Sequence, residues 1–274
     1  MNEIPHIIVI KVGTNVVTRE PAEAGGSRSL NLNVLQDLIR DIGKIRKETH
    51  DRVILVSSGA VASGEERIKM NSGNKIVDKQ GYAVVGQPRL TATYDMLFER
   101  VAPELVPAQG LLTSNNFKNE VERERMLRVL KELPENVVPI INENDFIATQ
   151  ELTFGDNDQL AALVAEHTHS RLLVLLTDVD CVYDKPPVYE DARMIKIIPE
   201  MVLTDEWINK TCGDVKGEKS AGGMASKLLA ARIVAAHGIP TVIAKGTERG
   251  NLYRIAVQRD QIGTTVNPES PAWP

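Results

Sequence analysis

Polar and charged residues directly follow four apolar segments of the chain. These segments end in Lys11-Val12-Gly13, Ser57-Ser58-Gly59-Ala60, Asn142-Glu143-Asn144-Asp145 and Thr177-Asp178. If the segments are parallel strands, their carboxyl ends meet at one edge of a sheet, where α/β proteins bind their ligands. Lysine, hydroxyl, amide and carboxylate side chains gathered there predict a site that handles a small anion.

Lys11 is the most informative of these charges, because it lies inside the apolar run IIVIKVG. An ammonium group is costly to bury there unless an anion accompanies it. A phosphate or a carboxylate would supply that anion. The alternative is a lysine at the end of a strand, with an apolar stem that carries its charge to water.

Two glycine-containing segments stand directly before predicted helices, namely Ser57 to Ala60 and Ala221 to Lys227. Backbone N–H groups at a helix start can hold an anion, and a nearby lysine suits a polyphosphate. The alternatives are a simple serine N-cap for the first segment and a surface loop with an exposed lysine for the second.

The sequences GAVASG, from Gly59 to Gly64, and GYAVVG, from Gly81 to Gly86, have the four-residue gap of a P-loop. Glu65 and Gln87 stand where the P-loop lysine would be, which excludes the Walker motif. If the protein uses ATP, another scaffold must bind it.

Gly155-Asp156-Asn157-Asp158 places two carboxylates and an amide at the start of an amphipathic segment. Such a cluster could organise lysines, bind a metal or cap a helix, where Asp and Asn are favoured. EF-hand spacing is absent. Together with Lys11 and Lys227, the cluster favours phosphoryl transfer, which requires chiefly positioning and cationic stabilisation of the transferred group.

The elements that must position these residues alternate along the chain. Short apolar, β-branched runs predict buried parallel strands at His6–Val12, Arg52–Ser58, Val137–Asn142, Arg171–Thr177 and Pro240–Ala244. Helical periodicity predicts helices at Leu32–Thr49, Ala60–Met70, Asp78–Arg100, Asn116–Lys131, Asp158–His167 and Met224–His237. The pattern predicts an α/β fold, a three-layer αβα sandwich with a mainly parallel central sheet. A small hairpin is expected within Asn142–Phe154, and exposed loops within Asp184–Ser220.

Composition argues against several classes of protein. A net charge of −5 and a pI near 5.7 disfavour nucleic acid as the principal partner, which would require clustered Lys and Arg. The N-terminus carries no signal-peptide pattern, and no apolar stretch is long enough for a membrane span. Cys181 and Cys212 show neither zinc-site nor disulfide spacing. A cytoplasmic protein without membrane contact is therefore expected.

Seven strings of the chain resemble the glutamate 5-kinase family of the amino acid kinase superfamily. They are IVIKVGTNVVT, VSSGAVASG, KQGYAVVGQPRL, VPIINENDFIAT, FGDNDQLAAL, LLTDVDCVY and AGGMASK. INEND followed by GDND separates this family from its superfamily siblings. The resemblance implies the amino acid kinase fold in a single domain over residues 1–274, with an amino-acid-binding lobe at about 1–169 and a nucleotide-binding lobe at about 170–274. It also implies ATP-dependent phosphorylation of the L-glutamate side chain, the first step of proline biosynthesis.

The resemblance implies a role for individual residues as well. The catalytic positions are Lys11, Lys227 and Asp158, the last organising the two lysines. The glutamate-binding positions are Ser58, Gly59, Ala60, Asn142, Asp145 and Asn157. The nucleotide-binding positions are Lys11, Gly13, Thr177, Asp178, Ala221, Gly222, Gly223, Met224 and Lys227. No protein metal site is expected, and Mg²⁺ would arrive with ATP.

The chain departs from the family pattern in two loops. Ala221 replaces the threonine of the usual TGGM string, and Cys181 stands where a glycine is common. The chain also ends before the carboxy-terminal PUA domain that many relatives carry, so a form without that domain is expected.

Proline as feedback inhibitor and a homo-oligomer are further expectations from the resemblance. The alternatives are a sibling kinase that acts on acetylglutamate, carbamate or a phosphonate, and a noncatalytic ligand-binding relative.

Overall fold

The computed structural model describes residues 6–21, 26–148, 156–212 and 223–266. An eight-stranded sheet forms its centre, in the order β10-β12-β11-β7-β1-β4-β6-β5. The strands are β1 (Ile7–Val12), β4 (Arg52–Ser57), β5 (Val106–Leu112), β6 (Val137–Glu143), β7 (Leu172–Thr177), β10 (Ile197–Ile198), β11 (Thr241–Lys245) and β12 (Thr264–Val266). Neighbouring strands are parallel except for the pair β11 and β12.

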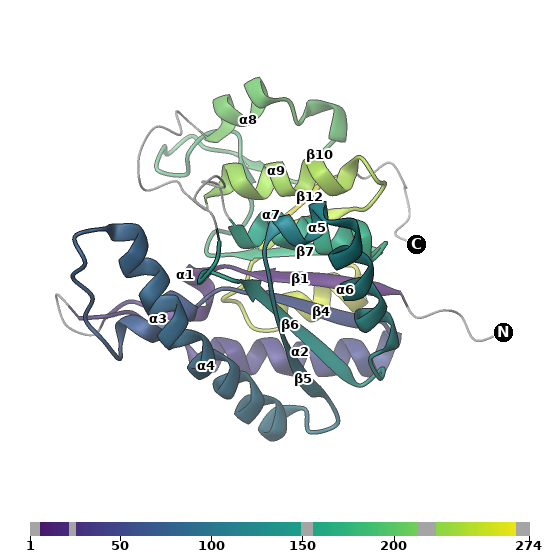
Figure 1. The fold of residues 1–274 in the computed structure, drawn as a ribbon. Coiled ribbons are helices and arrows are strands. Elements are labelled where there is room, and N and C mark those ends of the chain that lie inside the picture. The colour runs from purple at the N-terminus through teal and green to yellow at the C-terminus, as the bar shows by residue number, and fades with distance from the viewer. Residues whose placement is uncertain (1–5, 22–25, 149–155, 213–222, 267–274) are drawn as a thin grey trace.

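Helices cover both faces of the sheet, as the αβα prediction requires. In Figure 1, α7 and α9 lie above the sheet and α2 lies below it. The helices are α1 (Thr14–Val17), α2 (Leu32–Thr49), α3 (Ala60–Glu65), α4 (Lys75–Val101), α5 (Ser114–Lys118), α6 (Glu120–Glu132), α7 (Asp156–His167), α8 (Asp205–Cys212), α9 (Met224–Ala235) and α10 (Asn251–Tyr253), with short turns η1 (Glu200–Val202) and η2 (Arg254–Gln258).

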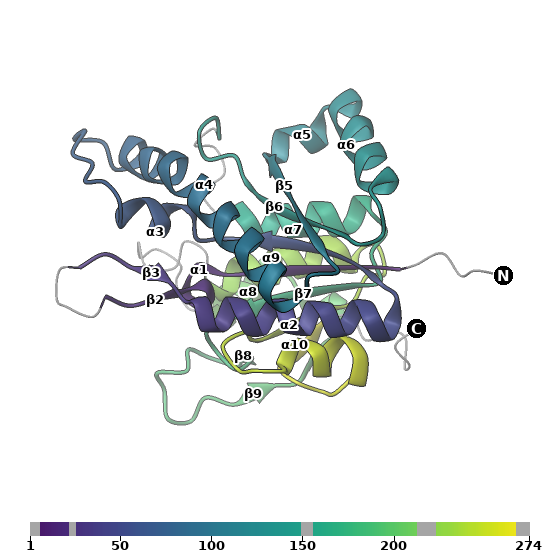
Figure 2. The same cartoon turned by 90° about the horizontal axis from the view of Figure 1, so that it is seen from below.

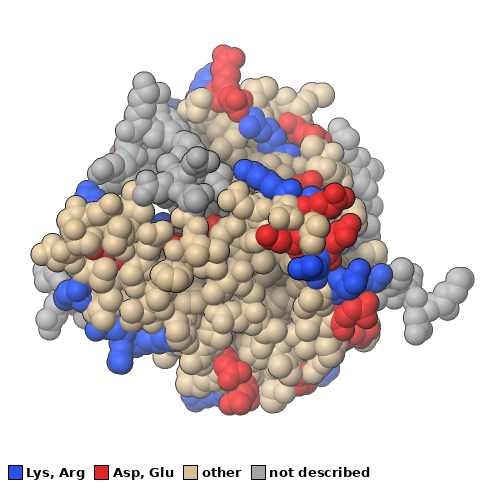
Figure 3. Space-filling model, viewed as in Figure 1, with Lys and Arg blue, Asp and Glu red and all other residues tan. Residues whose placement is uncertain are grey.

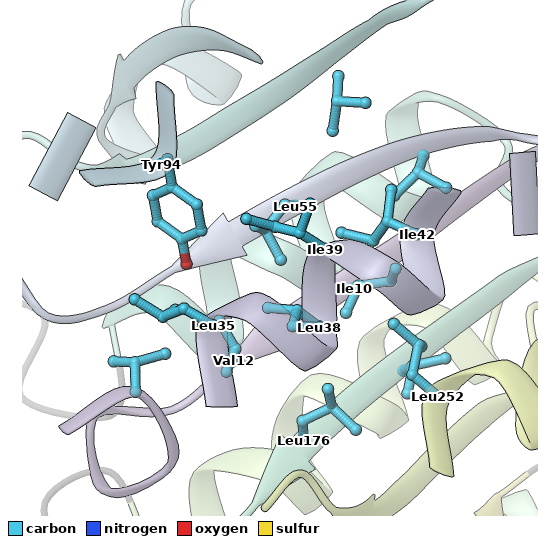
Figure 4. Close-up of a cluster of buried hydrophobic side chains, with 14 of the residues drawn as sticks. Ile10, Val12, Leu35, Leu38, Ile39, Ile42, Leu55, Tyr94, Leu176 and Leu252 are labelled. Carbon is cyan, nitrogen blue, oxygen red and sulfur yellow. The ribbon is translucent and has the colours of Figure 1, made fainter. Parts of the chain in front are cut away.

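Two apolar cores lie on the two faces. One joins α2, α4 and α10 to the sheet, and the other joins α7, α8 and α9 to its opposite face. Figure 4 shows part of the first core, where Ile39 of α2 and Tyr94 of α4 lie close to Leu55 of β4. The continuous apolar runs of β1, β4 and β7 arise because these strands are covered on both faces.

Strand β1 lies at the centre of the sheet, between β4 and β7. The chain first builds the half that contains β4, β5 and β6, and then crosses to the half that begins with β7. The strand order thus reverses at β1, which is the topological switch point where open α/β sheets bind ligands.

Small elements surround the carboxyl end of β1. Figure 2 shows the hairpin of β2 (Thr18–Arg19) and β3 (Ser29–Leu30) extending outward beyond α1, on the same side as α3. A second small pair, β8 (Val182–Tyr183) with β9 (Met194–Ile195), follows β7. Within the part of the chain that is described, no helix has the length and apolar character needed to cross a membrane.

The five predicted strands and the αβα layers are confirmed, and several boundaries are corrected. The helix predicted at Asn116–Lys131 is two helices, because the Asn119 side chain accepts hydrogen bonds from the backbone N of Val121 and Glu122 and starts α6 anew. The helix predicted from Ala60 ends at Glu65 instead of Met70.

Of the expected hairpin within Asn142–Phe154, residues 142–143 belong to β6 and residues 145–147 form a turn, whereas residues 149–154 lie outside the described residues. The irregular segment after Asp184 contains β9, β10, η1 and α8 up to residue 212.

Strand β5 has no counterpart among the predicted strands. It is an edge strand, paired with β6 alone, and its residues are exposed or half-buried rather than buried. Pro107 and Gly110 further weaken its strand pattern. Edge strands lack the double-sided burial that makes a central strand visible in a sequence.

Candidate active site

Three charged side chains from three elements meet in a buried cluster. Lys11 of β1 places Nζ 2.6 Å from Oδ1 of Asp158, which lies in the first turn of α7. Lys227, in the first turn of α9, places Nζ 3.2 Å from Oδ2 of the same carboxylate. The exposed fractions are 5% for Lys11, 1% for Asp158 and 4% for Lys227, so the cluster is withdrawn from bulk water.

Electrostatics follow from this geometry. Burial by itself raises the pKa of Asp158, but the ammonium groups of Lys11 and Lys227 outweigh burial and hold that pKa below its ordinary value. For Lys11, burial is the largest cause and lowers its pKa, with Asp158 opposing the change. Both ammonium groups therefore contact the same buried carboxylate.

Ser226 supports the cluster from the residue next to Lys227. Its Oγ lies 2.5 Å from Oδ2 of Asp158 and 2.8 Å from the backbone O of Gly223. The serine therefore links the carboxylate to the start of α9. Its position beside Lys227 in the sequence was the only available signal for it.

A second polar group lies at the carboxyl ends of β4 and β6. Asn157 places Nδ2 3.1 Å from Oγ of Ser58 and 2.9 Å from Oδ1 of Asn142. Oδ1 of Asn157 accepts a hydrogen bond from the backbone N of Glu143 at 3.1 Å. Asn157 and Asp158 are neighbours in α7, so one helix start joins this amide group to the lysine cluster.

Gly59 shapes the turn between β4 and α3. Its φ is +116°, a left-handed conformation that favours glycine. The turn is supported from α4 by a buried contact of 2.7 Å between the hydroxyls of Tyr94 and Ser57. Burial raises the pKa of Tyr94, which keeps its phenol protonated and able to donate this hydrogen bond.

The β7 side of the site carries Thr177 and Asp178. Oδ2 of Asp178 accepts a hydrogen bond from Nδ2 of Asn15 at 2.9 Å, and Nη1 of Arg28 lies 3.1 Å from Oδ1 of Asn15. Asn15 follows β1 and Arg28 precedes β3, so this chain of contacts ties the outer hairpin to the end of β7.

Gly13 keeps space beside Lys11. A Cβ atom at Gly13 would lie 3.5 Å from Nζ of Lys11, so the absent side chain leaves one flank of the ammonium group open. An anionic ligand could approach the lysine from that side.

One cleft of about 1160 Å³ is lined by the lysine cluster and by the group of Ser58, Asn142 and Asn157. Its lining contains every described residue of the predicted site, namely Lys11, Gly13, Ser58, Gly59, Ala60, Asn142, Asp145, Asn157, Asp158, Thr177, Asp178, Gly223, Met224 and Lys227. The remaining two, Ala221 and Gly222, lie outside the described residues. The cleft can therefore hold an anion between the lysines beside a polar pocket of serine and amide groups.

Comparisons with known proteins identify the family of the chain. The amino acid kinase family matches residues 6–245. A glutamate 5-kinase of Rippkaea orientalis is 40% identical over 270 residues, covering 96% of this chain and 69% of that protein. A glutamate 5-kinase of Caldanaerobacter subterraneus subsp. tengcongensis is 37% identical over 264 residues, covering 95% of this chain and 68% of that protein.

The chain belongs to the glutamate 5-kinases of the amino acid kinase family. It spans slightly more than two thirds of the length of these curated relatives. Solved structures with the same fold include the Giardia carbamate kinase, with a TM-score of 0.65, 16% identity and coverage of 97% of this chain and 99% of that one. UMP kinase from Bacillus anthracis has a TM-score of 0.62 and 13% identity, covering 97% and 98% of the two chains. At such identities these structures show the fold alone.

Several residues of this glutamate 5-kinase family member line the cleft without having been predicted from the sequence. Arg28, Lys79, Gln80 and Thr211 are among them. None lies at a strand end or in a glycine-rich turn. Arg28 and Lys79 carried only their charge as a signal, which they share with many surface residues.

The described residues contain no group of three or more His, Cys, Asp or Glu side chains arranged to hold a metal ion. Asp178, which lines the cleft, is a carboxylate next to the β7 end and could contact a metal ion that arrives bound to phosphates.

Proposed function

We propose that this protein transfers the γ-phosphoryl group of ATP to the side-chain carboxylate of L-glutamate, which starts proline biosynthesis. The bond between the γ-phosphorus and the oxygen bridging to the β-phosphate breaks. A bond from the γ-phosphorus to a glutamate carboxylate oxygen forms, giving ADP and L-glutamyl 5-phosphate. The observation that carries the proposal is the buried cluster of Lys11, Asp158 and Lys227, in a chain that belongs to the glutamate 5-kinases.

The lysine cluster supplies what phosphoryl transfer needs. Lys11 and Lys227 approach the transferring group from two elements, β1 and α9, and stabilise the charge on its oxygens. Asp158 holds both ammonium groups in place, so little reorganisation is required when the phosphate arrives. Mg²⁺ enters with ATP and neutralises part of the phosphate charge.

The acceptor requires no general base, since a carboxylate is already ionised near neutral pH. Ser58, Asn142 and Asn157 offer hydrogen-bonding groups to glutamate, and the backbone at Gly59 and Ala60 borders the same pocket. Asp145 is the partner for the glutamate ammonium group. The acceptor thus occupies the lobe of residues 1–169.

The nucleotide occupies the lobe of residues 170–274. Thr177 and Asp178 lie at the end of β7, and the segment from Ala221 to Met224 leads into α9. Gly13 leaves room for the phosphates beside Lys11.

Further properties belong to the same proposal. The protein acts in the cytoplasm, proline inhibits it, and copies of the chain associate into a homo-oligomer. Figure 3 shows uncharged residues over much of one face, with charges of both signs gathered on its right half and along its lower edge. Light scattering on the purified protein tests the oligomer, and a proline titration tests the inhibition.

An acceptor screen tests the reaction. With ATP and Mg²⁺, we expect ADP formation that depends on L-glutamate. Turnover only with N-acetylglutamate, carbamate or a phosphonate would assign the chain to a different acceptor, and no turnover with any of them would indicate a noncatalytic protein.

Lys227→Ala tests the catalytic assignment. Loss of one stabilising cation should lower kcat by about 100-fold or more. Lys245→Ala is the matched control, because Lys245 pairs with Asp180 on the surface and does not line the cleft. Equal turnover in the two variants would remove Lys227 from the mechanism.

A further inference from the structure

The orientation of two side-chain amides in the acceptor pocket is fixed by one backbone donor. The N–H of Glu143 lies 2.9 Å from Oδ1 of Asn142 and 3.1 Å from Oδ1 of Asn157. A backbone N–H can only donate, so both amides must present their oxygen atoms to it. Their NH₂ groups therefore point away from Glu143.

This orientation determines what Ser58 can do. The NH₂ group of Asn157 lies 3.1 Å from Oγ of Ser58, so the serine oxygen accepts that hydrogen bond. A hydroxyl that accepts in this way still has its own hydrogen to donate. Ser58 lines the cleft, and its hydroxyl can therefore donate to a carboxylate bound there.

Gln87 holds the other end of the same chain of hydrogen bonds. The NH₂ group of Asn142 donates to Oε1 of Gln87 at 2.7 Å, and Nε2 of Gln87 lies 3.4 Å from Oγ1 of Thr91. Gln87 lines a second cavity, of about 630 Å³ between α4 and β5, and is absent from the lining of the main cleft. Its hydrogen bond to Asn142 connects it to the acceptor pocket.

Helix α4 holds Gln87 rigidly at this place. The preceding residue, Gly86, packs so closely on α3 that a Cβ atom there would lie 1.8 Å from the backbone O of Ala60. Tyr94, seven residues after Gln87 and therefore on the same helix face, contacts Ser57 directly before Ser58. Two side chains of one helix face thus reach the polar ends of β4 and β6.

We propose that Gln87 is a positioning residue for the acceptor. Its carboxamide oxygen fixes Asn142, which with Asn157 leaves Ser58 as a hydrogen-bond donor toward the acceptor carboxylate. This role rests on the proposed function, because it assumes that glutamate occupies the pocket at Ser58.

Gln87→Met tests the role, because methionine has a similar size but no oxygen to accept from Asn142. We expect the KM for glutamate to rise about tenfold, while the KM for ATP and the thermal unfolding midpoint stay close to those of the unchanged protein. Gln87→Glu keeps an accepting oxygen and should restore the KM for glutamate to within about threefold. Gln109→Met is the matched control, since Gln109 of β5 lines the same second cavity without a contact to Asn142.

A double-mutant cycle with Ser58→Ala tests whether Gln87 acts through the serine. In the Ser58→Ala background, Gln87→Met should change the KM for glutamate by less than twofold. A full tenfold effect in that background would overturn the proposed route, as would an unchanged KM in the single variant. Parallel loss of ATP affinity and thermal stability would show a merely structural role.

The unchanged protein is assayed with L-glutamate first, and this separates the two proposals. If glutamate is phosphorylated and Gln87→Met behaves like the unchanged protein, the positioning role fails while the reaction stands. If glutamate is not phosphorylated, both the reaction and the role at Ser58 are overturned.

Discussion

Asp158 is the residue on which the charge balance of the site depends. It holds Lys11 at 2.6 Å and Lys227 at 3.2 Å inside the protein, so the three side chains carry a net positive charge. Preorganised cations stabilise negative charge that develops on a transferring group. The two lysines held by Asp158 are therefore suited to stabilise a phosphoryl group between them.

The unfolding free energy at acid pH should show the contribution of the Asp158 carboxylate to stability. The pKa of Asp158 in the folded protein lies below its ordinary value of 3.8, so its contribution to folding is present above pH 3.8 and is lost as the pH falls through the lowered pKa. We expect Asp158→Asn to be less stable than the unchanged protein at neutral pH. The difference in unfolding free energy should shrink below pH 3.8, as measured by denaturant unfolding at several pH values. A difference independent of pH would contradict the assignment.

At the scale of elements, the contact between α3 and α4 explains the glycine spacings that resemble a P-loop. A Cβ atom on Gly64 of α3 would lie 1.9 Å from the backbone O of Tyr82, and one on Gly86 of α4 would lie 1.8 Å from the backbone O of Ala60. These glycines allow two helix backbones to touch. The second glycine of each string therefore serves helix packing at the border of the acceptor pocket.

Gly86→Ala should push α3 and α4 apart, because the added Cβ atom would overlap the backbone of α3. We expect a loss of about 1–3 kcal/mol in unfolding free energy and a raised KM for glutamate, since Ala60 and Gln87 would move. Gly81→Ala on the same helix is the control. Its Cβ atom would meet only the flexible end of Met70, and alanine favours the helix. Thermal unfolding and steady-state kinetics compare the two variants, and equal stability would contradict the packing argument.

At the scale of the whole molecule, the carboxyl ends and the amino ends of the strands differ in function. The carboxyl ends of the strands carry the cleft, whereas the amino ends carry a buried ion pair. Arg171, before β7, places Nη2 2.5 Å from Oδ2 of Asp51, before β4, and the two strands flank β1. The pair joins the two halves of the sheet at the amino ends of the strands, away from the cleft.

Arg171→Leu should lower stability while leaving the reaction unchanged. Asp51 would remain buried without its partner, which costs about 3–5 kcal/mol in unfolding free energy. The double variant Asp51→Leu with Arg171→Leu should recover much of that loss, because no unpaired charge remains. Unfolding and the KM values for both substrates are measured for each variant. A change in either KM at a temperature where the variant is folded would show that the ion pair at the amino ends of the strands is coupled to the cleft at their carboxyl ends.

The sequence alone was sufficient to predict the central strands, the layers and many of the positions that line the cleft. Lys11 in an apolar run, the glycine turn after β4 and the polar residues after β6 and β7 are local signals, and burial and turn chemistry depend on neighbouring residues. The resemblance to the glutamate 5-kinases assigned roles to these positions. Edge strand β5 was not predicted, because a strand that pairs on one side only is partly exposed and has no continuous apolar run.

Only the tertiary structure decided which side chains meet. Asp158 and Lys227 are 69 residues apart, Gln87 and Asn142 are 55 apart, and Ser57 and Tyr94 are 37 apart. These contacts depend on the strand order and on the close packing of α3 against α4, neither of which leaves a periodic pattern in the chain. Many site residues were readable because they stand at the end of a strand or at the start of a helix, whereas Gln87 and Tyr94 lie inside α4, where a polar side chain that faces the sheet resembles any other.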